Sequence, residues 1–136
     1  MPFEYIEHEA DIGIKGTGKT VEEAFAEGAR AMFGIMVDLE KVDPVKRIEV
    51  ECEAENIGSL FVEFLNALLA QVNIAEMFFS KFEVKIDGTH LTATAWGEQI
   101  DQEKHQTKIE VKAATFSGLK YEEKDGVHSI QCVVDV

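Results

Sequence analysis

Carboxylate and imidazole side chains flank the first predicted strand–helix unit of this chain, and such groups could bind a cation or exchange protons. Within residues 3–38, His8, Glu9 and Asp11 lie at or near the start of a predicted strand, and Asp38 follows the helix. A simpler interpretation is that these acids only cap the elements and keep the surface hydrated. Spacing and residue type leave both interpretations open.

A phosphate-loop pattern, GxxxxGK[ST], is satisfied by residues 13–20, which read GIKGTGKT. A phosphate loop needs a buried apolar strand followed by a loop whose amides wrap the phosphate. Here the first three residues of the pattern continue a predicted strand, and Glu22 and Glu23 would crowd a bound phosphate. We therefore interpret the pattern as a glycine turn before a capped helix, which a nucleotide titration of Lys19→Ala would test.

The overall charge argues against direct binding to nucleic acid. The 136 residues carry 26 acidic and 13 basic side chains, a formal net charge of −13, which repels phosphate backbones. The length fits one domain, and the isolated Cys52 and Cys132 are typical of small buried residues in a reducing compartment. Because no amino-terminal apolar region and no run of about 18 apolar residues are present, we expect a cytoplasmic protein without a membrane segment.

Two segments show the apolar period of an amphipathic helix. Thr20 and Glu23 form a capping box, and the apolar stripe that follows predicts a helix over residues 20–37. Asn56 suits an N-cap, and a second stripe predicts a helix over residues 57–73.

Alternation of apolar and polar residues predicts strands over most of the remaining chain. They cover residues 3–7, 12–14, 48–52, 82–86, 91–95, 109–113, 119–121 and 130–134. We predict a hairpin turn at residues 87–88, another turn at 124–126, and a polar loop at 101–106. The order favours an α+β fold: an antiparallel or mixed β-sheet with two amphipathic helices packed on it, in a single compact domain over residues 1–136.

Seven short stretches share their order and spacing with one protein family. They are EHEADIGI (7–14), GKTVEEAF (18–25), AMFGIMVD (31–38), FLNALL (64–69), AWGE (95–98), VKAATFSGL (111–119) and VVDV (133–136). Together they resemble the archease family over the whole chain. Two departures are Glu9, where the family usually has threonine, and Phe116-Ser117, where Tyr-His is common. Glu9 adds a carboxylate beside Asp11, which could strengthen cation binding or change the preferred cation.

The resemblance implies a partner for the tRNA-splicing RNA ligase, which joins 2′,3′-cyclic-phosphate and 5′-hydroxyl RNA ends. Proteins of this family promote guanylylation of a ligase histidine and permit multiple turnover. They are not enzymes themselves, so no catalytic residue is expected. The resemblance gives no oligomeric state.

The family's cation site carries over onto Asp11, Asp135 and Val136. The implied ion is Ca²⁺, with Mg²⁺ or Mn²⁺ as alternatives. Such ions take oxygen ligands, and the terminal Val136 can offer a main-chain carboxylate. The alternative is that Asp11 and Asp135 are only polar residues at strand ends.

Five further residues are functional candidates: Asp38, Lys112, His8, Glu98 and His105. An acid after a helix C-terminus opposes the helix dipole, although a loop acid is common there. Lys112 could pair with Asp11 or Asp135, or contact a partner. A regular strand would place His8 and Asp11 on opposite faces, whereas a kink would bring them together. His105 lies in a polar loop, where a histidine is often only solvated.

Two other functions remain open from the sequence. One is a chaperone or specificity modulator of an RNA-modifying methyltransferase, which the family resemblance also suggests. The other is a small metal-dependent phosphoesterase built on Asp11, Asp38 and Asp135.

Overall fold

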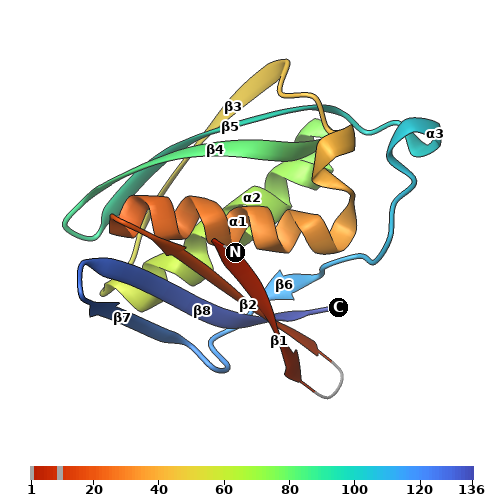
Figure 1. Cartoon of the computed structure of the whole chain (residues 1–136). Coiled ribbons are helices and arrows are strands. Elements are labelled where there is room, and N and C mark those ends of the chain that lie inside the picture. The colour runs from red at the N-terminus through yellow and green to blue at the C-terminus, as the bar shows by residue number, and fades with distance from the viewer. Residues whose placement is uncertain (1, 9–10) are drawn as a thin grey trace.

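A computed structural model describes residues 2–8 and 11–136, which form two antiparallel sheets with two long helices between them (Figure 1). The terminal sheet contains both ends of the chain: β1 (Phe3–His8), β2 (Asp11–Gly18), β6 (Ala113–Ala114), β7 (Lys120–Lys124) and β8 (Val127–Asp135). The central sheet contains β3 (Lys46–Glu53), β4 (Met77–Asp87) and β5 (His90–Gln99). The helices are α1 (Val21–Met36), α2 (Ile57–Ala75), the short α3 (Gln102–His105) and the 3₁₀ turn η1 (Leu39–Lys41).

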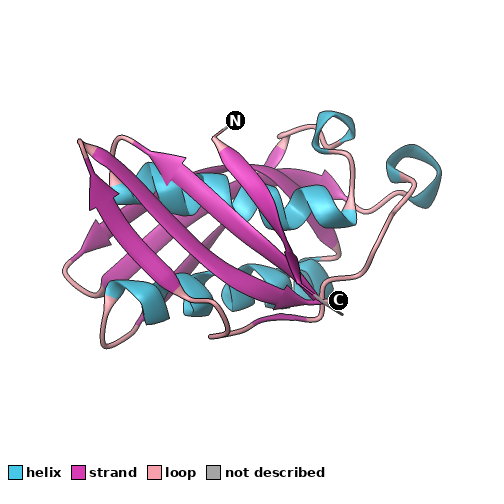
Figure 2. Cartoon of the chain, turned by 60° about the horizontal axis from the view of Figure 1, so that its bottom comes forward, coloured by secondary structure: helices cyan, strands magenta, loops and turns pink. Residues whose placement is uncertain are grey.

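The predicted α+β class is confirmed, but the expectation of one sheet is wrong. The helices lie in a layer between the two sheets, as Figures 1 and 2 show. The strand order is β1-β2-β8-β6 in the terminal sheet, with β7 also paired to β8, and β3-β5-β4 in the central sheet. Two sheets form because α1 is buried on more than one side and packs against β2 and β8 on one side and β4 on the other.

The first helix begins and ends close to its predicted limits. The predicted cap is formed, because the Glu23 N–H donates to Thr20 Oγ1 at 3.1 Å. The Glu23 carboxylate reaches back one residue beyond the N-cap and accepts from the Lys19 N–H at 2.8 Å. The preceding residues 13–18 belong to β2, and this excludes a phosphate-wrapping loop over them. At Gly16 the strand touches the helix backbone: a Cβ there would lie 2.1 Å from Ala24 O.

The second helix starts at its predicted cap, with the Ser59 N–H donating to Asn56 Oδ1 at 2.9 Å. Its inner side joins the core, where the Phe61 and Phe64 rings lie 5.0 Å and 6.0 Å from the Phe25 ring of α1. By length and composition α2 could also cross a membrane, contrary to the sequence expectation. Seven of its side chains are buried between the sheets, and this core position accounts for much of its apolar character.

Three local predictions need correction. Of the strand predicted at 109–113, only Ala113 is in a ladder, as the first residue of β6. The preceding Lys108 and Ile109 N–H groups donate instead to carbonyls at the end of α1. The polar loop at 101–106 contains α3, which the Asp101 side chain caps. The hairpin turn lies one residue later than predicted, at residues 88–89.

The last hairpin turn is as predicted. Asp125 and Gly126, which connect β7 to β8, have φ angles of 53° and 78°. Two successive residues with positive φ are the backbone of a type I′ turn, whose twist matches that of the flanking strands.

Candidate functional site

The start of β2 and the end of β8 meet at one end of the terminal sheet. Strands β2 and β8 are antiparallel neighbours, with Ile12 paired to Val134, so Asp11 and Asp135 occupy adjacent strand ends in this register. Ile12 and Val134 face the core. Because successive side chains of a strand point to opposite faces of the sheet, the two neighbouring aspartates point to its outer face. Both aspartates are half-buried.

His8 also reaches this end of the sheet. The sequence left two arrangements open for His8 and Asp11: opposite faces of one regular strand, or a kink that brings them together. The structure brings them together, since they lie on separate strands of a hairpin and are Cα partners across β1 and β2. The chain reverses between them, so no single regular strand contains both residues. The side chain of His8 and all of Glu9 lie outside the described residues, so the expected contribution of Glu9 stays a prediction.

Lys112 arrives at the same end from the other side of β8. Its N–H donates to Asp135 O at 2.8 Å, and the next residue, Ala113, pairs with Asp135 in the ladder. The Lys112 side chain is exposed and forms no ion pair with any described residue. The backbone thus brings together Asp11, Asp135 and Lys112, which are far apart in sequence.

The donor set here fits a hard cation. Asp11 and Asp135 supply two carboxylates, and neither makes a side-chain hydrogen bond or ion pair within residues 2–8 and 11–136. Val136 is the residue after the last one of β8, and its side chain is partly buried against the core. Among the residues that the structure describes, no cluster of three or more His, Cys, Asp or Glu side chains could hold a metal. Binding by two carboxylates with main-chain oxygens therefore stays a prediction.

Asp38 has a local structural role. It is exposed and caps η1, accepting from the Glu40 N–H at 3.1 Å. The helix dipole conflict expected from the sequence is small, because α1 ends at Met36 and Val37 follows as its C-cap. Capping thus accounts for an acid at this position, and its functional role stays a prediction.

Glu98 and His105 are brought together, in a network at the end of β5. Glu98 Oε2 lies 3.1 Å from His105 Nε2 and 2.8 Å from Lys104 Nζ. It also accepts from the Asp43 N–H at 2.8 Å. The Asp101 N–H donates to His105 Nδ1 at 2.9 Å, so the tautomer with its proton on Nε2 satisfies both contacts of this fully buried ring. This network attaches α3 to β5 and to the loop before β3.

The network also changes the ionisation of its central carboxylate. Burial acts to raise the pKa of Glu98, but hydrogen bonds from Lys104, the Asp43 N–H and His105 outweigh it and lower the pKa from 4.5 to about 2. Glu98 is therefore a structural anion that holds three segments of chain together.

Glu98→Gln is expected to lower stability at neutral pH by about 1–3 kcal/mol, because it weakens three hydrogen bonds to a charged acceptor. In the wild type this contribution is present above pH 4.5 and is lost as the pH falls toward about 2, since the folded-state pKa is depressed. Urea unfolding at a series of pH values should show that the difference in free energy of unfolding between the wild type and Glu98→Gln shrinks over that pH range. Glu49→Gln, at an exposed strand position, serves as the control. A difference independent of pH would contradict this role.

Asn66 is a residue that the sequence reasoning missed. Its side chain bonds both main-chain groups of Ala114: Nδ2 donates to the carbonyl at 3.1 Å, and Oδ1 accepts from the N–H at 2.9 Å. Asn66 thereby completes the edge of β6 and holds the strand that follows Lys112 against α2. The feature of the sequence that could have indicated this role is a single polar side chain within the apolar run FLNALL.

Asn66→Leu is expected to cost about 1–3 kcal/mol of stability, because it leaves both Ala114 groups without their partner. Hydrogen exchange at the Ala114 amide should accelerate, and the urea midpoint should fall. Asn73→Leu on the same helix is the control, since Asn73 is exposed and its side chain makes no hydrogen bond within the described chain. Equal exchange rates in the two variants would contradict the assignment.

Neither cysteine is an activated nucleophile. Burial raises the pKa of Cys132 to about 12, and burial with the nearby Glu63 and Glu51 carboxylates raises the pKa of Cys52 to about 11. Both are free thiols.

These features define a class of small α+β protein in which two sheets enclose two helices, and the start of β2 lies beside the end of the last strand, β8. Residues 3–136 match the Archease protein family (MTH1598/TM1083). The chain belongs to the archease family.

Relatives from several organisms are similar to this chain over nearly its whole length. It is 44% identical to the protein archease of Pyrococcus abyssi, with 98% of both chains covered. Protein 1598 of Methanobacterium thermoautotrophicum has a solution structure similar to this one, with a TM-score of 0.86 and 36% identity over 99% of both chains. An archease from Thermotoga maritima, described as a possible chaperone, shares the fold with a TM-score of 0.62 and 23% identity, covering 96% of this chain and 94% of that one.

Proposed function

We propose that this archease is a non-enzymatic cofactor of the tRNA-splicing RNA ligase that joins 2′,3′-cyclic-phosphate and 5′-hydroxyl ends. It promotes guanylylation of a ligase histidine and so permits multiple turnover. Family membership over residues 3–136 supports this proposal. The observation that carries it is the meeting of Asp11, Asp135 and Lys112 at one end of the terminal sheet.

In this proposal Asp11 and Asp135 hold a divalent cation, with Ca²⁺ first and Mg²⁺ or Mn²⁺ as alternatives, and a main-chain oxygen of Val136 completes the oxygen set. When bound, such an ion supplies positive charge for phosphate or carboxylate oxygens of the ligase complex. The exposed Lys112 presents a second positive charge beside it. The remaining acidic surface complements a basic RNA-binding cleft, which favours encounter with the ligase.

The free, unactivated thiols support a reducing, cytoplasmic location. We expect contact with RNA only through the ligase, since the net charge of −13 opposes direct binding.

A chaperone or methyltransferase-modulating role is the second candidate, favoured by the description of the Thermotoga maritima relative as a possible chaperone. The phosphoesterase alternative has less support. Asp38 forms no metal-holding cluster with Asp11 and Asp135 among the described residues, and its side chain already caps η1.

Multiple-turnover RNA ligation tests the proposal. Ligase at a concentration well below that of RNA is supplied with fixed Mn²⁺ and GTP, with the archease added or omitted. We expect about one product or fewer per ligase without it and many with it, together with faster labelling of the ligase by GTP. Equal yields would refute the proposal. General suppression of aggregation of unrelated proteins would then favour the chaperone role, and phosphoester turnover by the archease alone would favour an enzyme.

A further inference from the structure

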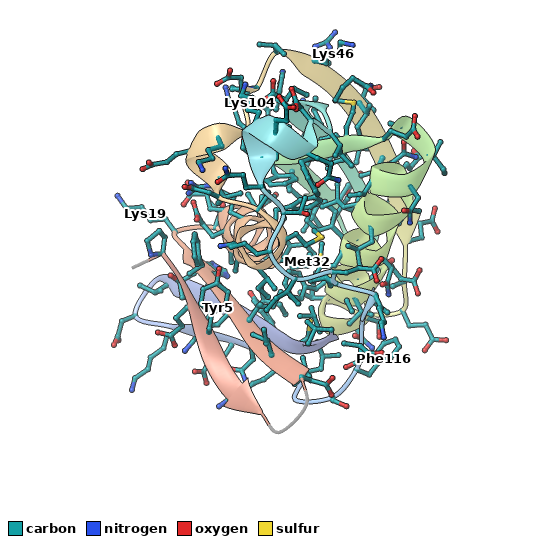
Figure 3. All side chains as sticks on the ribbon, turned by 90° about the vertical axis from the view of Figure 1, so that its right-hand side faces the viewer. Tyr5, Lys19, Met32, Lys46, Lys104 and Phe116 are labelled. Atoms are coloured by element: carbon teal, nitrogen blue, oxygen red, sulfur yellow. The ribbon has the colours of Figure 1, made fainter. Side chains whose placement is uncertain are left out.

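A groove opens beside the carboxyl end of α1. Its volume is about 730 Å³, and its apolar lining includes Leu69 and Val72 of α2 with Phe78 of β4. One wall is the strap, which we define as residues 106–112, the chain between α3 and β6. Figure 3 looks onto this side, where the strap descends from α3, which carries Lys104, toward the loop that carries Phe116.

The α2 wall of the groove carries almost no charge. Glu63 is the single charged residue among the 19 of this helix, in a chain in which 29% of residues are charged. Ala70, Asn73 and Ile74 are exposed on α2, and Ile74 is 74% exposed. A solvent-facing helix surface with a single charge, next to an apolar groove, is typical of a protein–protein contact.

The strap places positive charge on the opposite wall. Lys108 and Lys112 both line the groove, against one acid, Glu110. Neither lysine forms an ion pair with another residue of the described chain. Between them the exposed Ile109 adds an apolar contact, 49% accessible. In a chain of charge −13, a local excess of lysine next to apolar side chains favours an occupant that is apolar and acidic.

Part of the main chain beside the groove is already paired within the fold. The Lys108 N–H donates to Met36 O at 2.8 Å, and the Ile109 N–H to Ile35 O at 3.4 Å, which caps the end of α1. At the adjacent β6 edge, Asn66 occupies both groups of Ala114. These paired N–H groups are not available to an added strand, whereas a helix needs only side-chain contacts with the apolar lining of the groove.

We propose that this groove binds an amphipathic helix of the RNA ligase, with its apolar stripe between α2 and the strap and its acidic side chains beside Lys108 and Lys112. This inference rests on the proposed function and names the docking surface for it. Lys112 belongs both to the groove and to the sheet end where Asp135 lies. A ligase helix bound in the groove would hold the sheet end that carries Asp135 against the ligase.

Photo-crosslinking in the complete archease–ligase complex tests the contact directly. p-Benzoylphenylalanine is placed at Ala70 in the groove and, as a control, at the exposed Thr92 of the central sheet. We expect Ala70 to yield a ligase adduct that maps to a helix containing Asp or Glu, and Thr92 to yield none. Adducts only between two archease chains, or equal adducts from both positions, would overturn the proposal.

A matched pair of substitutions measures the energetic contribution. Ile109→Glu adds a charge in the groove, and Val127→Glu adds the same charge at the β7–β8 turn, where the valine is also 49% exposed. We expect Ile109→Glu to weaken ligase binding at least about tenfold and Val127→Glu to leave it unchanged. Both variants should keep wild-type Ca²⁺ affinity and circular dichroism.

The controls separate this inference from the function on which it rests. Lys108→Glu, at an exposed position, should also weaken binding, and excess protein should restore ligation by both groove variants. If wild-type archease fails to bind or activate the ligase, the proposed function and the docking surface both fail. If the wild type activates and the groove variants match it at limiting concentration, only the docking surface is refuted.

Discussion

Asp11→Asn is expected to lower the affinity for Ca²⁺ by on the order of a hundredfold and to abolish ligase activation. The substitution keeps the shape of the side chain but removes one of two carboxylates at the sheet end, and charge count is a main determinant of calcium affinity. Isothermal titration with Ca²⁺ measures the first effect. Multiple-turnover ligation with the variant in place of the wild type measures the second.

Stability gives an independent readout of the same substitution. Asp11 and Asp135 occupy facing positions on neighbouring strands, where like charges repel. Without a cation, Asp11→Asn should therefore be as stable as the wild type or slightly more stable. Added Ca²⁺ should raise the Tm of the wild type alone, because a ligand stabilises only the state that binds it.

A charge-matched control completes this test. Asp125→Asn removes one carboxylate at the exposed β7–β8 turn, where asparagine tolerates the positive φ of 53°. It should bind Ca²⁺ and activate the ligase like the wild type. If Asp11→Asn does the same, Asp11 has no part in a cation site.

Gly16→Ala is expected to destabilise the fold by at least about 3 kcal/mol. The added Cβ would lie 2.1 Å from Ala24 O and 2.4 Å from Gly28 N, both main-chain atoms of α1. No flexible side chain can move aside there, so the helix must separate from β2. Urea unfolding monitored by circular dichroism measures the loss.

Gly34→Ala on the same helix provides the contrast. Its Cβ would lie 2.7 Å from the Tyr5 hydroxyl, the far end of a side chain that can rotate away from its bond to Ala31 O. The gain in helix propensity, up to about 1 kcal/mol, offsets that lost bond. We expect a change within about 1 kcal/mol. A similar midpoint for both variants would show that the contact between β2 and α1 is not tight.

Local patterns in the sequence were sufficient to predict the two long helices and most of the strands. Thr20 with Glu23, and Asn56 with Ser59, form the predicted caps, because capping bonds join residues only three apart. The α+β class followed from the order of these elements. The archease family followed from seven motifs whose spacing is preserved along the chain.

Long-range pairing could not be derived from such patterns. The alternation at residues 109–111 is that of a strand, but the adjacent N–H groups bond the end of α1 instead of a neighbouring strand. Glu98 and His105 were separate candidates, and the fold joins them with Lys104 and Asp43 in one structural network.

The sequence by itself therefore determined the elements, their caps and the family, since these depend on contacts within a few residues or on preserved spacing. Only the tertiary structure decided that there are two sheets, that β2 lies beside β8, and that Asn66 completes the edge of β6. The physical reason is that strand neighbours and their register depend on which apolar faces can be buried together. That choice is made by the whole core and brings Asp11 next to Asp135 across more than a hundred residues of chain.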